Sequence, residues 1–526
     1  MNASEESLVH PFVGYDLPHL LDFQAKSRGT HPFLRWRPFE GQGYILTYAD
    51  FADAVARVAG SLQGRGVQKG DRVIIHLENC PEGMIAWFAC AWLGATAVMT
   101  NARSAPAELA YFASHSRAIA AITQPKFFRS LQESCRGLRW IAVTDSDNGD
   151  APAPDDLRER SLSFSDLLAG SDRAPLRAAE PLLPLGIQYT SGTTSRPKGV
   201  VMTHANALWG GKIGAAHTGL AASDIFLVHL PLYHVIALSY GVLSTLWAGG
   251  TVVLLPRFSA SRFWPISVAE KCTWSAMVPF CVRALAEQDV PTDHHYRAWG
   301  NAYWSADLAK RYNISILGWW GMTEIITHGI VGDVGRPGHP AAIGRPAPEY
   351  DVAIRRDDGS SIEVGETGHL FIRGRRGVSI FAGYLDDPKA TADSFDENGF
   401  FKTGDLVTLH SDGFVQFADR AKDMLKVGGE NVSASEIERV IQSVAGVREA
   451  AVVGRKHPML QEVAVAYVVA ASGGSDALRE QIVETCRTRL AEFKMPRGIH
   501  FLDELPRGLT EKVSKVELRR RANEEH

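Results

Sequence analysis

Apolar and polar positions follow two alternating periods along most of the chain. Segments 48–66 and 81–93 have the spacing of amphipathic or buried helices, and each is followed by a short apolar run, at 72–76 and 96–99, of the kind that forms a buried strand. The alternation continues at 105–115, 118–122, 205–216, 224–230 and 249–255. Helices that alternate with buried strands predict an α/β fold.

The pattern changes after about residue 351. Short alternating runs punctuated by glycine predict a compact β-rich region. They lie at 352–355, 369–373 and 414–417. Mixed helix and strand patterns return after the charged, unpatterned segment 419–423. We therefore predict a large N-terminal domain over 1–418, a hinge at 419–423 and a small, mobile α+β C-terminal domain over 424–526.

Composition narrows the class of protein. A chain of 526 residues is too long for one core, and its 45% hydrophobic and 22% charged content is that of a soluble globular protein. The formal net charge of −4 gives no sign of a nucleic-acid partner. Six scattered cysteines without a C-x-x-C pair predict free thiols in a reducing cytoplasm. The apolar run 87–99 is too short to insert into a membrane. A homodimer is compatible with all of this.

One loop concentrates the candidate chemistry. Between two predicted strands the chain runs Tyr189-Thr-Ser-Gly-Thr-Thr-Ser-Arg-Pro-Lys-Gly199. Successive backbone N–H groups and hydroxyls in such a turn form an anion-binding concavity, and Lys198 adds a positive charge. The loop is not a Walker loop, because Pro197 precedes the lysine and a glycine follows it. It predicts a polyphosphate site.

A second motif follows a predicted strand at 314–317. The sequence Gly318-Trp-Trp-Gly-Met-Thr-Glu324 places a glycine turn at the end of this strand, where open α/β sheets bind ligands. Thr323 supplies a hydroxyl, and Glu324 supplies a hard oxygen suited to Mg²⁺. Read alone, the segment slightly favours a core Trp pair followed by a helix cap; beside the preceding loop it favours a ligand site.

Together with three later motifs in the same order, these segments resemble the adenylate-forming superfamily of acyl- and aryl-CoA synthetases, adenylation domains and luciferases. The later motifs are Phe401-Lys-Thr-Gly-Asp405, Lys426-Val-Gly-Gly-Glu-Asn431 and Leu505-Pro-Arg-Gly-Leu-Thr-Glu-Lys-Val513. The resemblance implies that ATP or AMP is held by Thr190, Ser191, Gly192, Thr193, Thr194, Lys198, Trp320, Thr323, Asp405, Arg420 and Lys512. Within this set, Trp320 would stack on adenine, and Asp405 with Arg420 would hold the ribose.

The resemblance also assigns the remaining roles. Catalytic residues would be Lys512, Thr323, Glu324 and His234; Mg²⁺ would bind at Glu324 and Thr194; Lys426, Gly428 and Gly429 would line the CoA tunnel; and Lys422 would be the hinge pivot. The family normally has glycine before the catalytic lysine, whereas this chain has Glu511. Rotation about the hinge would exchange the lysine loop for the tunnel loop between half-reactions.

The acid pocket is implied at His234, Tyr303, Trp304 and Trp319. Bulky aromatics there would reshape or shorten the pocket, and they could flank a ring, a branched acid or a quaternary ammonium. Segments such as His76-Leu-Glu-Asn-Cys-Pro-Glu82 and Asn101-Ala-Arg103 resemble the carnitine/crotonobetaine-CoA ligase branch. The acid is therefore left open among aromatic, branched, short aliphatic and betaine types.

The implied function is ATP- and Mg²⁺-dependent ligation of a small carboxylic acid to CoA through an acyl adenylate. Two alternatives stay open from the sequence. The chain could load a carrier protein instead of CoA, or it could be an inactive nucleotide-binding homologue, for which Glu511 beside Lys512 is the one supporting feature.

Overall fold

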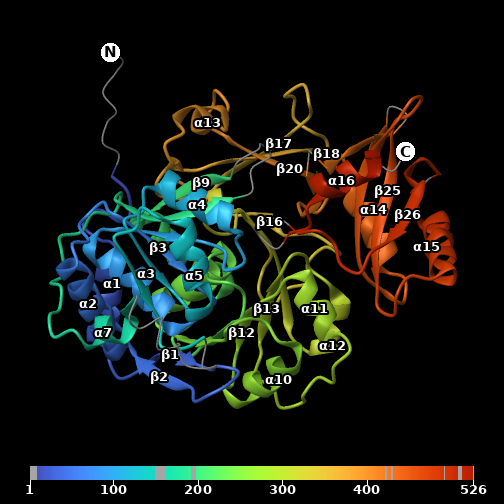
Figure 1. The fold of residues 1–526 in the computed structure, drawn as a ribbon. Helices are drawn as coiled ribbons and strands as arrows, with labels where there is room; N and C mark the ends of the chain where they lie inside the picture. The colour runs from blue at the N-terminus through green and yellow to red at the C-terminus, as the bar shows by residue number, and fades with distance from the viewer. Residues whose placement is uncertain are drawn as a thin grey trace. The chain divides into compact units, whose positions relative to one another are not determined.

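The computed structural model describes residues 9–147, 161–190, 197–420, 423–427, 430–490, 492–507 and 512–524. These residues form two compact units (Figure 1). The first contains the chain up to Thr190 together with Arg196–Asp351 and Arg373–Gly399, and the second contains Val352–Ile372 and the chain from Phe400 onward. The predicted hinge segment 419–423 lies within the second unit, and its role as a pivot stays a prediction.

An eight-stranded sheet in the first unit has the order β19-β9-β8-β4-β3-β5-β6-β7 over the described residues. Its strands are β3 (Arg72–His76), β4 (Thr96–Met99), β5 (Ala120–Thr123), β6 (Trp140–Val143), β7 (Leu162–Ser163), β8 (Pro184–Thr190), β9 (Lys198–Thr203) and β19 (Gly383–Tyr384). Strands β3 to β8 pair in parallel, and β9 and β19 add antiparallel partners at one edge. The expected α/β class is confirmed.

The second sheet of this unit has nine strands in the order β16-β15-β14-β13-β12-β10-β11-β1-β2, again counted over the described residues. Its strands are β1 (Pro32–Trp36), β2 (Tyr44–Thr47), β10 (Ile225–Val228), β11 (Thr251–Leu254), β12 (Trp274–Ala276), β13 (Ala298–Asn301), β14 (Ser315–Trp320), β15 (Ile330–Val331) and β16 (Arg345–Pro346). The sequence pattern gave no indication of β1 and β2, which cross from the N-terminus to join strands found after residue 224.

Helices of the first unit pack around and between these sheets. They are α1 (Leu17–Arg28), α2 (Tyr48–Gly64), α3 (Pro81–Leu93), α4 (Pro106–Ser116), α5 (Pro125–Ser134), α7 (Phe164–Ala169), α8 (His204–Thr218), α9 (Ser244–Ala248), α10 (Ala260–Ala269), α11 (Pro279–Leu285), α12 (Ala306–Tyr312) and α13 (Pro388–Asp393). Helix α3 is apolar on all sides and almost wholly buried, as expected of a helix between layers. It starts with proline in its first turn and ends at Gly94, whose φ of 76° closes the helix.

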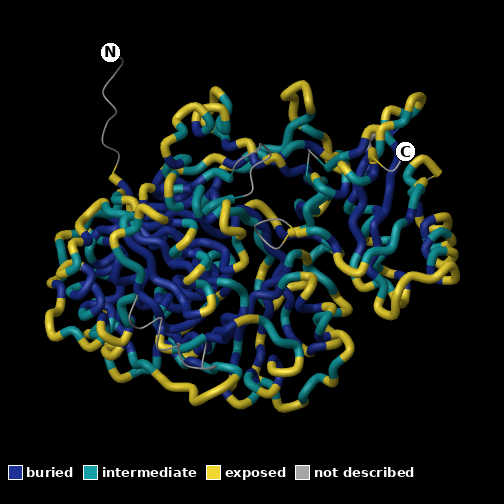
Figure 2. The backbone as a smooth tube through the Cα atoms, viewed as in Figure 1, coloured by how far each residue is buried: buried dark blue, intermediate teal, exposed yellow. Residues whose placement is uncertain are grey.

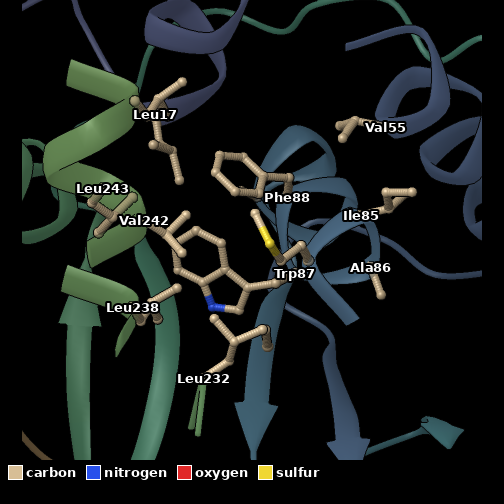
Figure 3. Packing of buried hydrophobic residues seen from close by; sticks show 14 of the residues in the cluster. Leu17, Val55, Ile85, Ala86, Trp87, Phe88, Leu232, Leu238, Val242 and Leu243 are labelled. Carbon is tan, nitrogen blue, oxygen red and sulfur yellow. The ribbon is translucent and has the colours of Figure 1, made fainter. Parts of the chain in front are cut away.

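The apolar stretch at 235–247 forms the π-helix η1 (Ile236–Leu243) followed by α9. Figure 3 shows Leu238 and Val242 of η1 directed toward Trp87 and Phe88 of α3, with all four side chains buried. This contact joins the helices of the two sheets into one core. Short π-helical segments occur frequently at functional sites.

The described residues of the second unit form two smaller sheets. The predicted β-rich region is a four-stranded sheet of β17 (Asp351–Arg355), β18 (Thr367–Arg373), β20 (Phe401–Leu409) and β21 (Val415–Arg420). A five-stranded sheet follows, made of β22 (Leu425–Val427), β23 (Glu430–Val432), β24 (Val447–His457), β25 (Gln461–Ala470) and β26 (Gly498–Phe501). Its helices are α14 (Ala434–Gln442), α15 (Asp476–Arg489) and α16 (Lys515–Glu524).

Helices cover both faces of this five-stranded sheet. Val452 and Ala464 pack with α14 and α15, whereas their neighbours Val453 and Val465 pack with Leu518 of α16. Burial on both faces explains the unbroken apolar runs in β24 and β25, which Figure 2 draws in dark blue. Helix α15 ends at Arg489, because Leu490 has extended backbone.

None of the helices in the described part of the chain has the length and hydrophobicity of a membrane span.

Candidate active site

Lys198 of segment 189–199, called the phosphate loop below after its predicted role, stands at the start of the antiparallel strand β9. Strands β8 and β9 flank the loop, as predicted, and pair so that Thr190 faces Lys198. Ser191, Gly192, Thr193 and Thr194 lie outside the described residues. The hairpin therefore fixes the two ends of the loop, with Lys198 half-buried at its exit.

A tyrosine that the sequence did not single out connects this lysine to Glu324. Strand β19 pairs with β9 and places Tyr384 opposite Val200. The Nζ atom of Lys198 lies 4.7 Å from the centroid of the Tyr384 ring, and the Tyr384 hydroxyl donates to Oε1 of Glu324 at 3.0 Å. Burial, followed by the Glu324 carboxylate, raises the pKa of Tyr384 above its ordinary value, so the phenol keeps its proton.

Glu324 is held firmly and lies almost wholly within the protein. It belongs to the short helix η2 (Thr323–Ile325), is 5% exposed, and its backbone carbonyl accepts the N–H of Phe381 at 2.8 Å. No cluster of three or more His, Cys, Asp or Glu side chains that could hold a metal occurs among the described residues. A single fixed carboxylate nevertheless fits Mg²⁺ that arrives with a nucleotide, because such ions take one or two carboxylates and complete their shell with phosphate and water.

Two neighbouring tryptophans end strand β14 and point to opposite faces of the sheet, as consecutive strand residues must. Both are buried, at 5% exposure for Trp319 and 8% for Trp320. Trp319 belongs to the large core shared with η1. The two indoles thus lie on different sides of the strand, and the acid and adenine roles implied for them stay predictions.

The Trp319 indole is enclosed by aromatic rings. It stacks on His328 at a centroid distance of 4.7 Å and an interplanar angle of 15°, and it meets the edge of Tyr240 at 5.3 Å. The far end of the indole lies over Gly300, where an added Cβ would stand 1.8 Å from Cη2 of Trp319. Only glycine fits at that point of β13, so the indole occupies space that a side chain or a ligand would otherwise fill.

His328 is fully buried, and neither of its ring nitrogens has a hydrogen-bond partner among the described residues. Burial, reinforced by the nearby His217, holds its pKa well below the ordinary range. The imidazole is therefore neutral, and it acts here as a flat, apolar-faced partner for Trp319.

The other residues expected at the acid pocket lie elsewhere along the same carboxyl edge. His234 precedes η1, and its carbonyl accepts the N–H groups of Ala237 and Leu238 that start the π-helix. Tyr303 is 38% exposed. Trp304 packs with a different core cluster from that of Trp319. The structure thus joins Trp319 with residues of η1, and it does not bring Trp304 into the same cluster.

The expected ribose residues form an ion pair in the second unit. Asp405 of β20 faces Arg420 of β21, and Nε of Arg420 lies 2.7 Å from Oδ1 of Asp405. Asp405 is 1% exposed, and its N–H donates to Thr403 Oγ1 at 3.1 Å. Gly404, with φ of 74°, lies within β20 where the register with β18 shifts, an irregularity that glycine accommodates. A carboxylate and a guanidinium are thus fixed side by side.

The C-terminal lysines are accessible. Lys426 is an exposed residue of β22, and Lys512 is an exposed residue three positions before α16. Lys422, Gly428 and Gly429 lie outside the described residues. The structure therefore locates two of the five expected positions in this part of the chain.

Sequence reasoning did not find Tyr384, Tyr240 or His328. Each is a single aromatic residue in an apolar stretch, where core packing is the usual role. Their relation to the site depends on contacts between distant segments. Tyr384 and Glu324 are 60 positions apart in the sequence, and Tyr240 and Trp319 are 79 positions apart.

Comparisons with known proteins agree with this geometry. A family model described as AMP-binding enzyme matches residues 21–385, and one described as AMP-binding enzyme C-terminal domain matches residues 436–512. Crotonobetaine/carnitine–CoA ligase from Citrobacter koseri is 32% identical over 524 residues, which cover 96% of this chain and 99% of that protein. The protein of the same name from Escherichia coli strain SE11 is 33% identical over 491 residues, covering 90% and 93%.

Solved structures show the same fold. The anthranilate CoA ligase AuaEII in complex with anthranoyl-AMP superposes with a TM-score of 0.86 at 24% identity, covering 97% of this chain and 98% of that one. The o-succinylbenzoate coenzyme A synthetase of Bacillus subtilis in complex with AMP gives 0.82 at 26% identity, covering 96% and 98%. The motifs, the fold and these matches together establish that the chain belongs to the AMP-binding enzyme family.

Proposed function

We propose that the chain activates a compact carboxylic acid with ATP and transfers the acyl group to CoA. The carboxylate oxygen would attack the α-phosphorus of ATP, so that acyl-AMP forms and pyrophosphate leaves. The thiol sulfur of CoA would then attack the acyl carbon, so that the thioester forms and AMP leaves with the thiol proton passed to solvent. Both steps depend on positioning and charge neutralisation.

The single observation that carries the proposal is the arrangement of Lys198, Tyr384 and Glu324. A cation at the exit of a phosphate-type loop and a buried carboxylate share one tyrosine. This combination suits a polyphosphate that brings its own metal ion. Mg²⁺, when bound through Glu324, and through Thr194 as the family resemblance implies, would supply charge neutralisation for the phosphates.

The remaining site residues take the roles that the family implies. Ser191, Gly192, Thr193 and Thr194 would hold the outer phosphates with Thr190 and Lys198, and Thr323 would contact the α-phosphate. Trp320 would stack on adenine. The fixed pair of Asp405 and Arg420 supports a ribose contact, because a carboxylate held by its neighbour can accept from both ribose hydroxyls. Lys512 would contact the carboxylate and the α-phosphate during activation.

The packing of Trp319 supports a compact acid. An indole held between His328, Tyr240 and Gly300 fills the space along β13, so a long alkyl chain would have to displace it. His234, Tyr303 and Trp304 would line the rest of the pocket. Short aliphatic, branched, aromatic and betaine-type acids are the classes to test, and the names of the relatives, crotonobetaine/carnitine–CoA ligases, are a reason to include the betaine type.

The second half-reaction would use a different surface of the C-terminal domain. With the domains at 1–418 and 424–526, rotation about 419–423 would withdraw Lys512 and present Lys426, Gly428 and Gly429 along the CoA tunnel. Lys422→Pro should then spare adenylation and block thioester formation. Equal loss of both half-reactions would contradict Lys422 as the pivot.

All six cysteines are free and buried. Free thiols support the proposal that the protein acts in a reducing compartment such as the cytoplasm.

Acid-dependent pyrophosphate release, measured with and without CoA across the four acid classes, tests the proposal. Release with one class, with thioester formed when CoA is present, is the expected result. Accumulated acyl-AMP without thioester would identify a carrier protein as the acceptor. ATP binding without pyrophosphate release from any acid would overturn the proposal in favour of an inactive nucleotide-binding protein.

A further inference from the structure

The segment that carries Lys512 is closed at its base. Arg507 and Val513 form an isolated antiparallel bridge, and the N–H of Ser514 donates to the carbonyl of Pro506 at 2.7 Å. Leu505 and Leu518 on either side of this base are buried in the same core cluster. The position of Lys512, one residue before the bridge, therefore depends on how the start of α16 is held.

Lys515, the first residue of α16, turns into the protein. Its side chain is 17% exposed, and its Nζ lies 2.8 Å from Oε1 of Glu438 on α14. The same oxygen of Glu438 accepts the N–H of Val452 at 2.7 Å, which fixes the carboxylate against β24. Three residues after the exposed Lys512, the chain is thus anchored by a largely buried ion pair.

Further carboxylates surround Lys515. Burial opposes its charge, but Glu438, Asp419 and Asp423 raise its pKa above the ordinary value, so the ammonium stays charged. Asp419 is 3% exposed, and its Oδ2 accepts from Ser433 Oγ at 3.1 Å and from the N–H of Ser435 at 3.2 Å.

One turn further along α16, Arg519 reaches toward Asp423, with Nη2 3.5 Å from Oδ1. Two cations on one side of α16 therefore face three carboxylates, which come from the end of β21, from the residues after it and from α14. This group, Lys515, Arg519, Glu438, Asp419 and Asp423, is called the α16 anchor below.

A largely buried ion pair is weak evidence for stability, because desolvation offsets most of the attraction. Its clear effect is on geometry, since it fixes which groups lie side by side. The α16 anchor joins the lysine-bearing segment to the predicted hinge segment 419–423, where two of its carboxylates stand.

We propose that Lys515 is a positioning residue for adenylation: its pair with Glu438 fixes the start of α16, and with it Lys512, to α14, while Arg519 joins the same helix to Asp423 of the hinge segment. The inference rests on the role of Lys512 in the proposed function. A shift of about 1 Å in a reacting group can cost roughly 100-fold in rate. Loss of the anchor should therefore slow adenylation without affecting attack by CoA.

The test compares two half-reactions in the full-length protein. The double variant Glu438→Gln/Lys515→Met removes both charges of the Lys515–Glu438 pair. Asp423 keeps Arg519, Asp419 keeps its hydrogen bonds from Ser433 and Ser435, and the glutamine oxygen can still accept from Val452. The acid that gives most pyrophosphate release in the wild type is the substrate, and its synthetic acyl adenylate with CoA reports the second half-reaction. We expect a loss of about 10- to 100-fold in pyrophosphate release and less than a threefold change in thioester formation.

Two further variants separate positioning from folding. Lys515→Arg keeps the charge and should retain most of the adenylation rate. Glu436→Gln removes another ion pair of α14, with Lys494 at 2.8 Å, that does not touch α16, and it should leave both half-reactions unchanged. The melting temperature of each variant, compared with that of the wild type, will report whether the variant is folded.

The outcomes distinguish this inference from the proposed function. If Lys512→Ala itself keeps full adenylation, the assigned role of Lys512 fails and the inference fails with it. If Lys512→Ala abolishes adenylation but the folded double variant keeps the wild-type rate, only the positioning role of Lys515 is overturned. Equal loss of both half-reactions in the double variant would also overturn it.

Discussion

The hydroxyl of Tyr384 donates to Oε1 of Glu324 at 3.0 Å, across 60 positions of sequence, while the face of the same ring lies against Lys198. One aromatic side chain therefore orients the proposed metal ligand and neighbours the proposed phosphate ligand. The arrangement depends on β19 pairing with β9 beside the end of the phosphate loop.

Tyr384→Phe should weaken adenylation while preserving the contact between the ring and Lys198. A hydrogen bond to a charged group contributes about 1.5 kcal/mol or more, so the rate should fall roughly tenfold. The loss should appear mainly as a higher Mg²⁺ requirement in pyrophosphate release, because the orientation of Glu324 is what changes.

Tyr384→Leu provides the comparison, because it removes the ring as well as the hydroxyl. It should be more damaging than Tyr384→Phe and should also raise the KM for ATP. Wild-type Mg²⁺ dependence in both variants would refute a role for Tyr384 in holding Glu324.

Trp319→Ala should widen the range of acids toward longer chains. The substitution removes an indole that fills space over Gly300, and the cavity created should accept several methylene groups. We expect kcat/KM for the best wild-type acid to fall and that for acids two to four carbons longer to rise, measured by pyrophosphate release.

Trp304→Ala provides a comparison within the proposed pocket, and it should extend the acid range less than Trp319→Ala. Trp304 follows strand β13, the neighbour of β14 in the sheet, but it packs in a different core cluster from Trp319. If Trp304→Ala extends the acid range and Trp319→Ala does not, the pocket lies on the other face of β14 from the one proposed.

Asp405→Asn should weaken nucleotide binding in particular. The amide can accept only one of two ribose hydrogen bonds, and it loses its charge opposite Arg420. A roughly tenfold rise in the Kd for ATP is expected by calorimetry. Asp357→Asn, at an exposed pair with His369, should leave the Kd unchanged. A Kd that also stays unchanged in Asp405→Asn would remove Asp405 from the site.

Acid should destabilise the first unit through His76. Burial lowers the pKa of His76 to about 4 from an ordinary value of 6.5, and the side chain is 1% exposed. Because the unfolded state binds the proton more readily, the stability contribution is fully present above pH 6.5 and falls as the pH drops toward 4. At about pH 4, one histidine with this pKa shift lowers the free energy of unfolding by about 3 kcal/mol.

Calorimetric melting at pH 7 and pH 4.5 tests this. His76→Gln keeps a polar partner for Thr100, whose hydroxyl lies 2.8 Å from Nδ1 of His76, but it does not titrate. Between pH 7 and pH 4.5 the melting temperature of the variant should fall by less than that of the wild type. An equal loss would show that His76 does not contribute to acid sensitivity.

The sequence by itself determined the local elements and the chemistry of the motifs. Period and composition decide whether a short segment forms a buried strand or a helix, so β3, α3 and β4 appear where the pattern predicts them. The hydroxyl-rich loop before Lys198 is one continuous run of sequence, and so is the turn before Glu324. Each motif could therefore be recognised from the sequence, and together they identified the family and the nucleotide chemistry.

Only the tertiary structure decided which distant segments meet. No local signal places β1 and β2 in the sheet of β10 to β16, or brings Tyr384 to Glu324, Gly300 under Trp319, and Lys515 to Glu438. Such contacts arise from strand order and from burial on both faces of a sheet, which depend on the whole chain. A single aromatic or lysine has the same local pattern whether it fills a core, faces solvent or orients a reacting group.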